Sequence, residues 1–133
     1  MTTFVDTSAL LALLDANDRR HAEARTVWER LLEQDEPLVC TSYVLVEAFA
    51  LLQHRLGVAA VRTFNEDVQP LLHVEWVEAV GHGRSVAALL TAGRRQLSLV
   101  DCASFEAMRR LGLTNVFAFD QHFGEQGFTC LSA

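Results

Sequence analysis

Apolar and polar positions along the chain follow two different periods. Short apolar runs rich in β-branched and aromatic residues alternate with longer segments in which apolar residues recur every three to four positions, as in an amphipathic helix. The pattern predicts strands at residues 2–6, 38–41, 71–77, 115–120 and 128–131. It predicts helices at residues 8–15, 19–34, 42–56, 58–68, 79–91 and 98–111, with Ser8, Ser42 and Ser98 as candidate N-caps.

Strands that alternate with helices indicate a parallel α/β sheet, covered by helices on both faces and connected by right-handed crossovers. In such sheets, binding and catalytic sites form at the carboxyl ends of the strands. Asp6 and Asp120 are each the first polar residue after a predicted apolar strand. We therefore expect both carboxylates at that edge of the sheet.

The composition fits one domain over residues 1–133. Half of the residues are apolar, which is enough for a hydrophobic core without disulfides or structural metals. No segment is rich in Ser, Gly or Pro, so no linker or disordered tail is predicted. The apolar run at residues 9–14 is far shorter than the roughly 20 residues of a membrane span, and no signal peptide is visible. We expect a cytoplasmic protein without membrane association.

Three cysteines, Cys40, Cys102 and Cys130, lie far apart in apolar contexts. Their odd number and wide separation favour reduced, buried thiols over disulfides. A zinc site would require Cys or His pairs at closer spacing.

The formal net charge of −6 is unusual for a protein that binds nucleic acid, because phosphate binding depends on clustered basic residues. All 11 basic residues are arginines, which suit bidentate phosphate contacts. If four carboxylates together held two divalent ions, the bound charge would offset four of the negative charges.

Most of the 17 acidic residues look like solvated surface. Glu29, Glu66 and Glu106 each have an arginine three or four residues away, the spacing of ordinary surface ion pairs on a helix. Glu47 and Asp101 have no such partner, although both border apolar helix faces. They are therefore candidates for a functional site.

Inward-facing carboxylates without cationic partners are costly, and several of them at one edge would repel one another. A divalent cation resolves both problems, because Mg²⁺ is commonly bound by a few carboxylates and water. The predicted ligands are Asp6, Glu47, Asp101 and Asp120. The alternative is that each acid separately caps a helix or meets an arginine in space.

Five other positions have two interpretations each. Ser8 and Ser104 are either helix caps or residues that orient a ligating carboxylate or water. His122 is most simply a surface-loop histidine, although it could join the metal or contact substrate. Arg94 and Arg95 form a solvated turn or a contact for RNA phosphates.

The absence of lysine excludes several phosphate-handling classes. There is no Gly-rich phosphate loop with lysine, so a nucleoside triphosphatase is not predicted. Receiver domains and haloacid-dehalogenase-type phosphatases also place an aspartate after the first strand, but both rely on a lysine. The phosphatase motif additionally needs a second aspartate where this chain has Ser8.

Four sequence blocks occur in the order Phe4-Val-Asp-Thr-Ser-Ala-Leu-Leu, Thr41-Ser-Tyr-Val-Leu-Val-Glu47, Ser98-Leu-Val-Asp101-Cys-Ala-Ser and Phe119-Asp120-Gln-His-Phe123. In this combination, and over nearly the whole chain, the sequence resembles PIN domains, specifically the VapC-like toxins of toxin-antitoxin pairs. The resemblance implies a three-layer α/β/α fold with a parallel sheet of strand order 3-2-1-4-5. It also implies endonucleolytic cleavage of RNA, a homodimer, and an antitoxin whose C-terminal tail covers the active site.

In the family, four clustered acids bind Mg²⁺ or Mn²⁺, and they fall on Asp6, Glu47, Asp101 and Asp120. Asp6 and Asp101 would be primary ligands, Asp120 would complete the first or a second metal, and Glu47 would ligate or position the attacking water. Hydrolysis would leave 5′-phosphate and 3′-hydroxyl ends. Two alternatives remain: a non-catalytic PIN-like module that binds RNA or protein, and a flap-type DNA nuclease, for whose extra elements the chain has little room.

Overall fold

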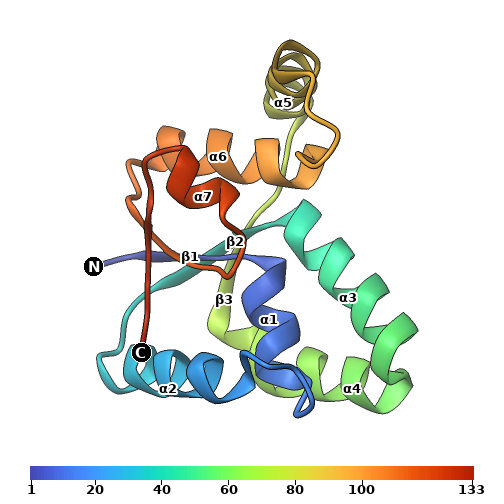
Figure 1. The fold of residues 1–133 in the computed structure, drawn as a ribbon, viewed down its shortest axis with the longest axis vertical. Coiled ribbons are helices and arrows are strands. Elements are labelled where there is room, and N and C mark those ends of the chain that lie inside the picture. The colour runs from blue at the N-terminus through green and yellow to red at the C-terminus, as the bar shows by residue number, and fades with distance from the viewer.

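The computed structural model describes residues 1–133, and its five strands form one parallel sheet of order β3-β2-β1-β4-β5 (Figure 1). The strands are β1 (Thr3–Val5), β2 (Leu38–Thr41), β3 (Leu72–Glu75), β4 (Asn115–Phe117) and β5 (Thr129–Cys130). Central β1 pairs with both neighbours, so that Phe4 lies opposite Val39 and Val116. The predicted fold class and strand order are confirmed.

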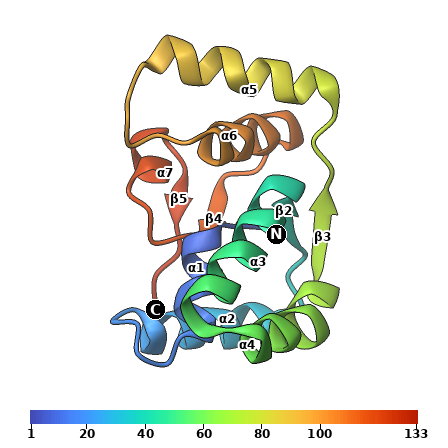
Figure 2. The same cartoon turned by 90° about the vertical axis from the view of Figure 1, so that its right-hand side faces the viewer.

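Seven α-helices surround the sheet: α1 (Thr7–Leu14), α2 (His21–Glu33), α3 (Ser42–Leu56), α4 (Val58–Thr63), α5 (Ala79–Ala92), α6 (Leu99–Leu111) and α7 (His122–Glu125). In Figures 1 and 2, α6 and α7 lie on one side of the sheet with α5 beyond α6, and α1, α2 and α4 lie on the other side. None of these helices has the length and apolar content needed to cross a membrane.

Two of the three predicted caps are wrong by one or two residues. The N-caps of α1 and α3 are Asp6 and Thr41, whose extended backbones lead directly from a strand into the helix. Their side chains accept hydrogen bonds from the N–H groups of the first helical turn, which leaves Ser8 and Ser42 inside the helices. Ser98 caps α6 as predicted.

The predicted strand at residues 115–120 ends earlier than expected, because β4 stops at Phe117. Asp120 therefore lies in the loop between β4 and α7. The predicted helix at residues 58–68 is also interrupted: α4 continues into a π-helical turn at Phe64–Val68, followed by a 3-10 turn that contains Pro70. Proline has no N–H to donate and cannot continue the helix.

A single hydrophobic cluster fills the space between the sheet and the helices, and Phe4, Phe117 and Phe123 within it are fully buried. Cys40 and Cys102 are free, buried thiols, as predicted. Burial raises the pKa of Cys40 to about 12, which keeps this thiol protonated. The prediction that Cys130 is buried is wrong, because the short edge strand β5 leaves it exposed.

Candidate metal centre

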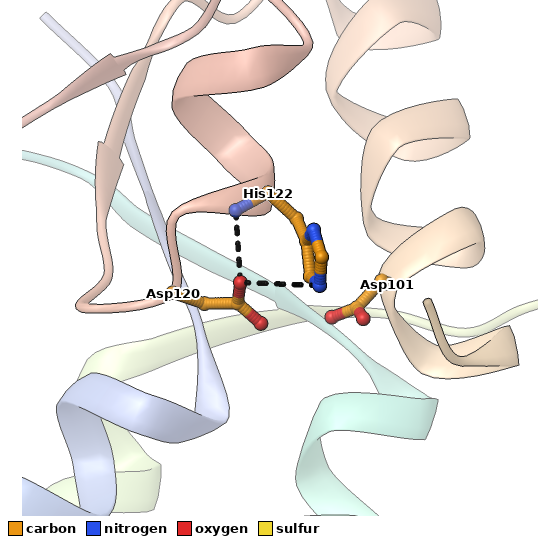
Figure 3. Close-up of side chains that lie close together, drawn as sticks. All are labelled: Asp101, Asp120 and His122. Atoms are coloured by element: carbon orange, nitrogen blue, oxygen red, sulfur yellow. Dashed lines mark hydrogen bonds and ion pairs between the residues drawn. The ribbon is translucent and has the colours of Figure 1, made fainter. Parts of the chain in front are cut away.

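Asp101, Asp120 and His122 come together at the carboxyl edge of the sheet (Figure 3). Asp101 lies in the first turn of α6, Asp120 in the loop after β4, and His122 at the start of α7. One ligand atom from each of the three side chains lies within 4.8 Å of the other two. This separation allows all three atoms to bind one cation.

Asp6 follows β1, which is paired with β4, and its side chain is only 4% exposed. Burial raises the pKa of Asp6 to about 7, against the lowering effect of its hydrogen bonds with Ser8. The negative charges of Asp101 and Asp120 raise it further, so all three carboxylates share one electrostatic environment. Asp6 lies outside the group of ligand atoms, within 4.8 Å of one another, that Asp101, Asp120 and His122 form. The structure therefore brings Asp101 and Asp120 together, with Asp6 near enough for its charge to interact with theirs.

Glu47 lies in the second turn of α3 and is half-buried. Its carboxylate is not part of the group of ligand atoms formed by Asp101, Asp120 and His122. It is also absent from the charges that shift the pKa of Asp6. The structure does not bring Glu47 together with the aspartates, and its role as a ligand or water-positioning residue stays a prediction.

Ser8 fixes the carboxylate of Asp6 on one side. Its hydroxyl donates to Asp6 Oδ2 at 2.6 Å, and its backbone N–H donates to the same oxygen at 3.1 Å. The Ser8 hydroxyl also accepts from the N–H of Phe119 at 3.0 Å, which ties the end of β1 to the loop that carries Asp120. Ser8 thus orients a candidate ligand, one of its two predicted roles.

Asp101 and Asp120 are also each held in place by a hydrogen bond to one of their two carboxylate oxygens. Asp101 Oδ2 accepts from the N–H of Ser98 at 3.1 Å, and the Ser98 hydroxyl accepts from the N–H of Asp101, so the pair forms a capping box. Asp120 Oδ1 accepts from the N–H of His122 at 2.9 Å. Ser104, by contrast, donates to the backbone carbonyl of Val100 at 3.0 Å and contacts no carboxylate.

These hydrogen bonds are compatible with both interpretations of the acids, as helix caps and as metal ligands. Asp6 and Asp101 do cap helices, which was the alternative to a metal site. Each cap uses only one carboxylate oxygen, and Asp6 Oδ1, Asp101 Oδ1 and Asp120 Oδ2 accept no hydrogen bond from the chain. Burial also raises the pKa of Asp101, and the nearby charge of Asp120 acts in the same direction. Capping explains how the carboxylates are oriented, but it leaves their accumulated negative charge without a partner.

The interpretation of His122 as a surface-loop residue is wrong, because the residue is only 7% exposed. It is buried since α7 packs on α6, where the ring of Phe123 meets that of Phe105 edge to face at 5.0 Å. The one available sequence signal was Glu125, which follows His122 at a helical spacing of three residues. The carboxylate oxygens fit a divalent cation of the Mg²⁺ or Mn²⁺ type, and the imidazole nitrogen is a donor more typical of transition-metal sites.

Arginines lie next to the aspartates. Arg19 and Arg20 line a cavity of ≈460 Å³ together with Asp120, and they also line one of ≈360 Å³ together with Ser8 and Arg55. The guanidinium of Arg20 pairs with Glu23 at 3.2 Å, whereas Arg19 and Arg55 are exposed and form no ion pair. The site therefore has a positive margin although the chain as a whole is acidic.

Comparisons with known proteins identify the family and the fold. The model of the PIN domain family matches residues 3–128. A Mycobacterium tuberculosis protein, the 23S rRNA-specific endonuclease VapC20, is 38% identical over 127 residues, which are 94% of either chain. The crystal structure of M. tuberculosis VapC20, described as a toxin that cleaves the sarcin-ricin loop, has a TM-score of 0.87 and 32% identity, covering 99% of this chain and 100% of that one. FitAcB from Neisseria gonorrhoeae, at 13% identity and a TM-score of 0.68, covers 98% of this chain and 96% of its own and shares the fold.

The raised pKa of Asp6 predicts how the stability of the metal-free protein depends on pH. The folded state retains a proton that the unfolded state releases from about pH 4 upward, so the free energy of unfolding falls as pH rises until about pH 7. The fall attributable to Asp6 is on the order of 4 kcal/mol at most. Between pH 5 and pH 7 the fall is about 2.7 kcal/mol, and urea denaturation in EDTA at pH 5 and pH 8 measures this part.

Asp6→Asn removes this charge and keeps a good N-cap. The free energy of unfolding of this variant should therefore change less between the two pH values, and at pH 8 it should equal or exceed that of the wild-type protein. Asp67→Asn, at an exposed position, should keep the wild-type pH dependence. An Asp6→Asn variant with an unchanged pH dependence and lower stability at pH 8 would mean that Asp6 is a helix cap and nothing more.

Proposed function

The chain belongs to the PIN domain family, and from this premise we propose that it is a divalent-metal-dependent endoribonuclease that hydrolyses RNA phosphodiester bonds. The observation that carries the proposal is the grouping of Asp101 and Asp120 with His122 within 4.8 Å, with buried Asp6 nearby, and each aspartate keeps an oxygen that accepts no hydrogen bond. The 38% identity to an endonuclease over 94% of the chain supports it. Residues 1–133 act as one catalytic domain.

Asp6, Asp101 and Asp120 would hold Mg²⁺ or Mn²⁺, and Glu47 would ligate the metal or position the water. Such an ion lowers the pKa of a bound water and stabilises negative charge that develops on the phosphate oxygens. Ser8 and Ser98 hold the carboxylates in place by hydrogen bonds, so the ligands need little rearrangement. Hydrolysis leaves 5′-phosphate and 3′-hydroxyl ends without a protein nucleophile.

The arginines beside the site supply the affinity for RNA that the acidic net charge would otherwise oppose. Arg19 and Arg55 are exposed and form no ion pair, so both guanidinium groups can bind phosphates, Arg19 in the cavity that Asp120 lines and Arg55 in the neighbouring cavity that Ser8 lines. Because the relative is specific for 23S rRNA, we take structured ribosomal RNA as the substrate class of this chain as well. We therefore propose that the reaction takes place in the cytoplasm, where ribosomal RNA is found.

The relative described as a toxin supports a toxin role for this chain, and we further propose a protein antitoxin and a homodimer. Trp76, Val80 and Leu90, in and just before α5, are 67%, 66% and 74% exposed, so this surface suits contact with a second copy. Light scattering tests the dimer, and a monomeric mass at micromolar concentration would refute it. A neighbouring reading frame whose product binds and inhibits the nuclease would identify the antitoxin.

Asp101→Asn should reduce RNA cleavage at least about 100-fold, because it weakens a metal ligand while the capping box can persist. Glu106→Gln is the matched control: it lies five residues on in α6, and its carboxylate pairs with Arg84 and Arg110 at 3.8 and 3.6 Å, away from the site. Its cleavage rate with Mg²⁺ or Mn²⁺ should be close to wild type. Cleavage that persists in excess EDTA, or equal losses in the two variants, would contradict the proposal.

Removing the two unpaired arginines should weaken RNA binding through lost phosphate contacts. In an Asp101→Asn background, Arg19→Gln with Arg55→Gln should make the slope of log K against log salt shallower by roughly 1.4, about 0.7 for each contact with single-stranded RNA. Arg25→Gln with Arg62→Gln removes the same charge on helices α2 and α4 and should leave the slope nearly unchanged. Fluorescence anisotropy over a salt series measures both, and equal slopes for the two double variants would refute the assignment.

A further inference from the structure

His122 is a buried histidine whose ring makes no hydrogen bond. The residue is 7% exposed, and Nδ1 is enclosed without a hydrogen-bond partner. Buried polar atoms usually have a partner, because an unsatisfied one loses its hydration without compensation. The isolated protein therefore leaves Nδ1 incompletely satisfied, on the side of the ring that faces Glu125.

The two ring nitrogens face different groups. Nε2 lies 3.9 Å from Asp120 Oδ1, and the ring presents a nitrogen within 4.8 Å of carboxylate oxygens of both Asp101 and Asp120. Figure 3 shows this side of the ring directed toward the two aspartates. On the other side, Nδ1 lies 3.4 Å from Glu125 Oε1. A histidine that binds a metal through one nitrogen commonly directs the other to a carboxylate in this way.

Glu125 is held in turn by Arg94. Arg94 Nη1 donates to Glu125 Oε2 at 3.0 Å, which leaves Oε1 facing the histidine. This hydrogen bond lowers the pKa of Glu125 and keeps it ionised. Arg94 precedes α6, whose first turn carries Asp101, so one ion pair connects the segment leading into α6 with α7.

We propose that His122 Nε2 is a ligand of the cation held by Asp101 and Asp120, and that Glu125, fixed by Arg94, positions the imidazole ring. The inference rests on the proposed metal site and adds a nitrogen to it. An imidazole ligand favours transition metals such as Mn²⁺ and Co²⁺ over Mg²⁺, which prefers oxygen. The metal centre should therefore prefer Mn²⁺ and Co²⁺ over Mg²⁺. A site made of carboxylates alone would differ less in its affinity for these ions.

Pulsed electron paramagnetic resonance of the Mn²⁺-loaded protein tests the bond without reference to activity. A directly bound imidazole nitrogen modulates the electron spin echo, and labelling the histidines with ¹⁵N changes that modulation in a known way. We expect the nitrogen signal in wild type and in His73→Gln, and its loss in His122→Gln. His73 is a matched control because its side chain is 70% exposed and has Glu75 at 3.9 Å.

Calorimetric titration gives the second readout. His122→Gln should weaken Mn²⁺ and Co²⁺ binding about 10-fold or more and Mg²⁺ binding much less, and Glu125→Gln should weaken Co²⁺ binding in the same direction. If His122→Gln does not fold, the labelled wild-type protein and Glu125→Gln still decide the question.

The outcomes separate the inference from the function on which it rests. Mn²⁺ that binds without a histidine nitrogen signal, or a signal that persists in a folded His122→Gln, would overturn the role of His122 and leave the proposed nuclease intact. Absence of any Mn²⁺ binding by the wild-type protein would overturn both.

Discussion

Three carboxylates, two of them buried and the third half-buried, lie near one another at the carboxyl edge of the sheet, and the surrounding structure has to compensate for their repulsion. The parallel pairing of β1 with β4 places Asp6 and the loop carrying Asp120 side by side. The capping box at the start of α6 adds Asp101. Local hydrogen bonds satisfy one oxygen of each, and burial keeps the pKa of Asp6 high. A divalent cation would remove the remaining cost, so the same arrangement that destabilises the metal-free protein prepares a binding site.

The arginines around this edge of the sheet matter because of the negative charge of the same three carboxylates. Arg19 and Arg55 border the cavities that adjoin the aspartates, so a polyanion can approach a cluster of negative charge once that cluster is neutralised. Net charge is therefore a poor guide to substrate in this chain, because the local distribution around the site differs from the total of −6.

The sheet and much of the site could be predicted from the sequence, because the patterns that indicate them involve residues close together in the chain. Asp6 and Asp120 each end an apolar run, and Asp101 lacks a cationic neighbour on its helix. The environment of His122 could not be predicted in this way, since its burial depends on the packing of Phe123 against Phe105 across two helices. Caps were misplaced at α1 and α3 because the strands lead into the helices without an intervening loop. Cys130 was misjudged because an apolar context does not reveal that β5 is an edge strand with both residues exposed.

The most direct test of a metal centre at this edge is a crystal structure of the protein grown with Mn²⁺, with anomalous diffraction recorded at the manganese absorption edge. The account predicts an anomalous peak within about 2.0 to 2.4 Å of oxygens from Asp101 and Asp120, on the side facing Asp6. A protein that crystallises in saturating Mn²⁺ without a peak there, or with its strongest peak among the surface acids, would contradict it.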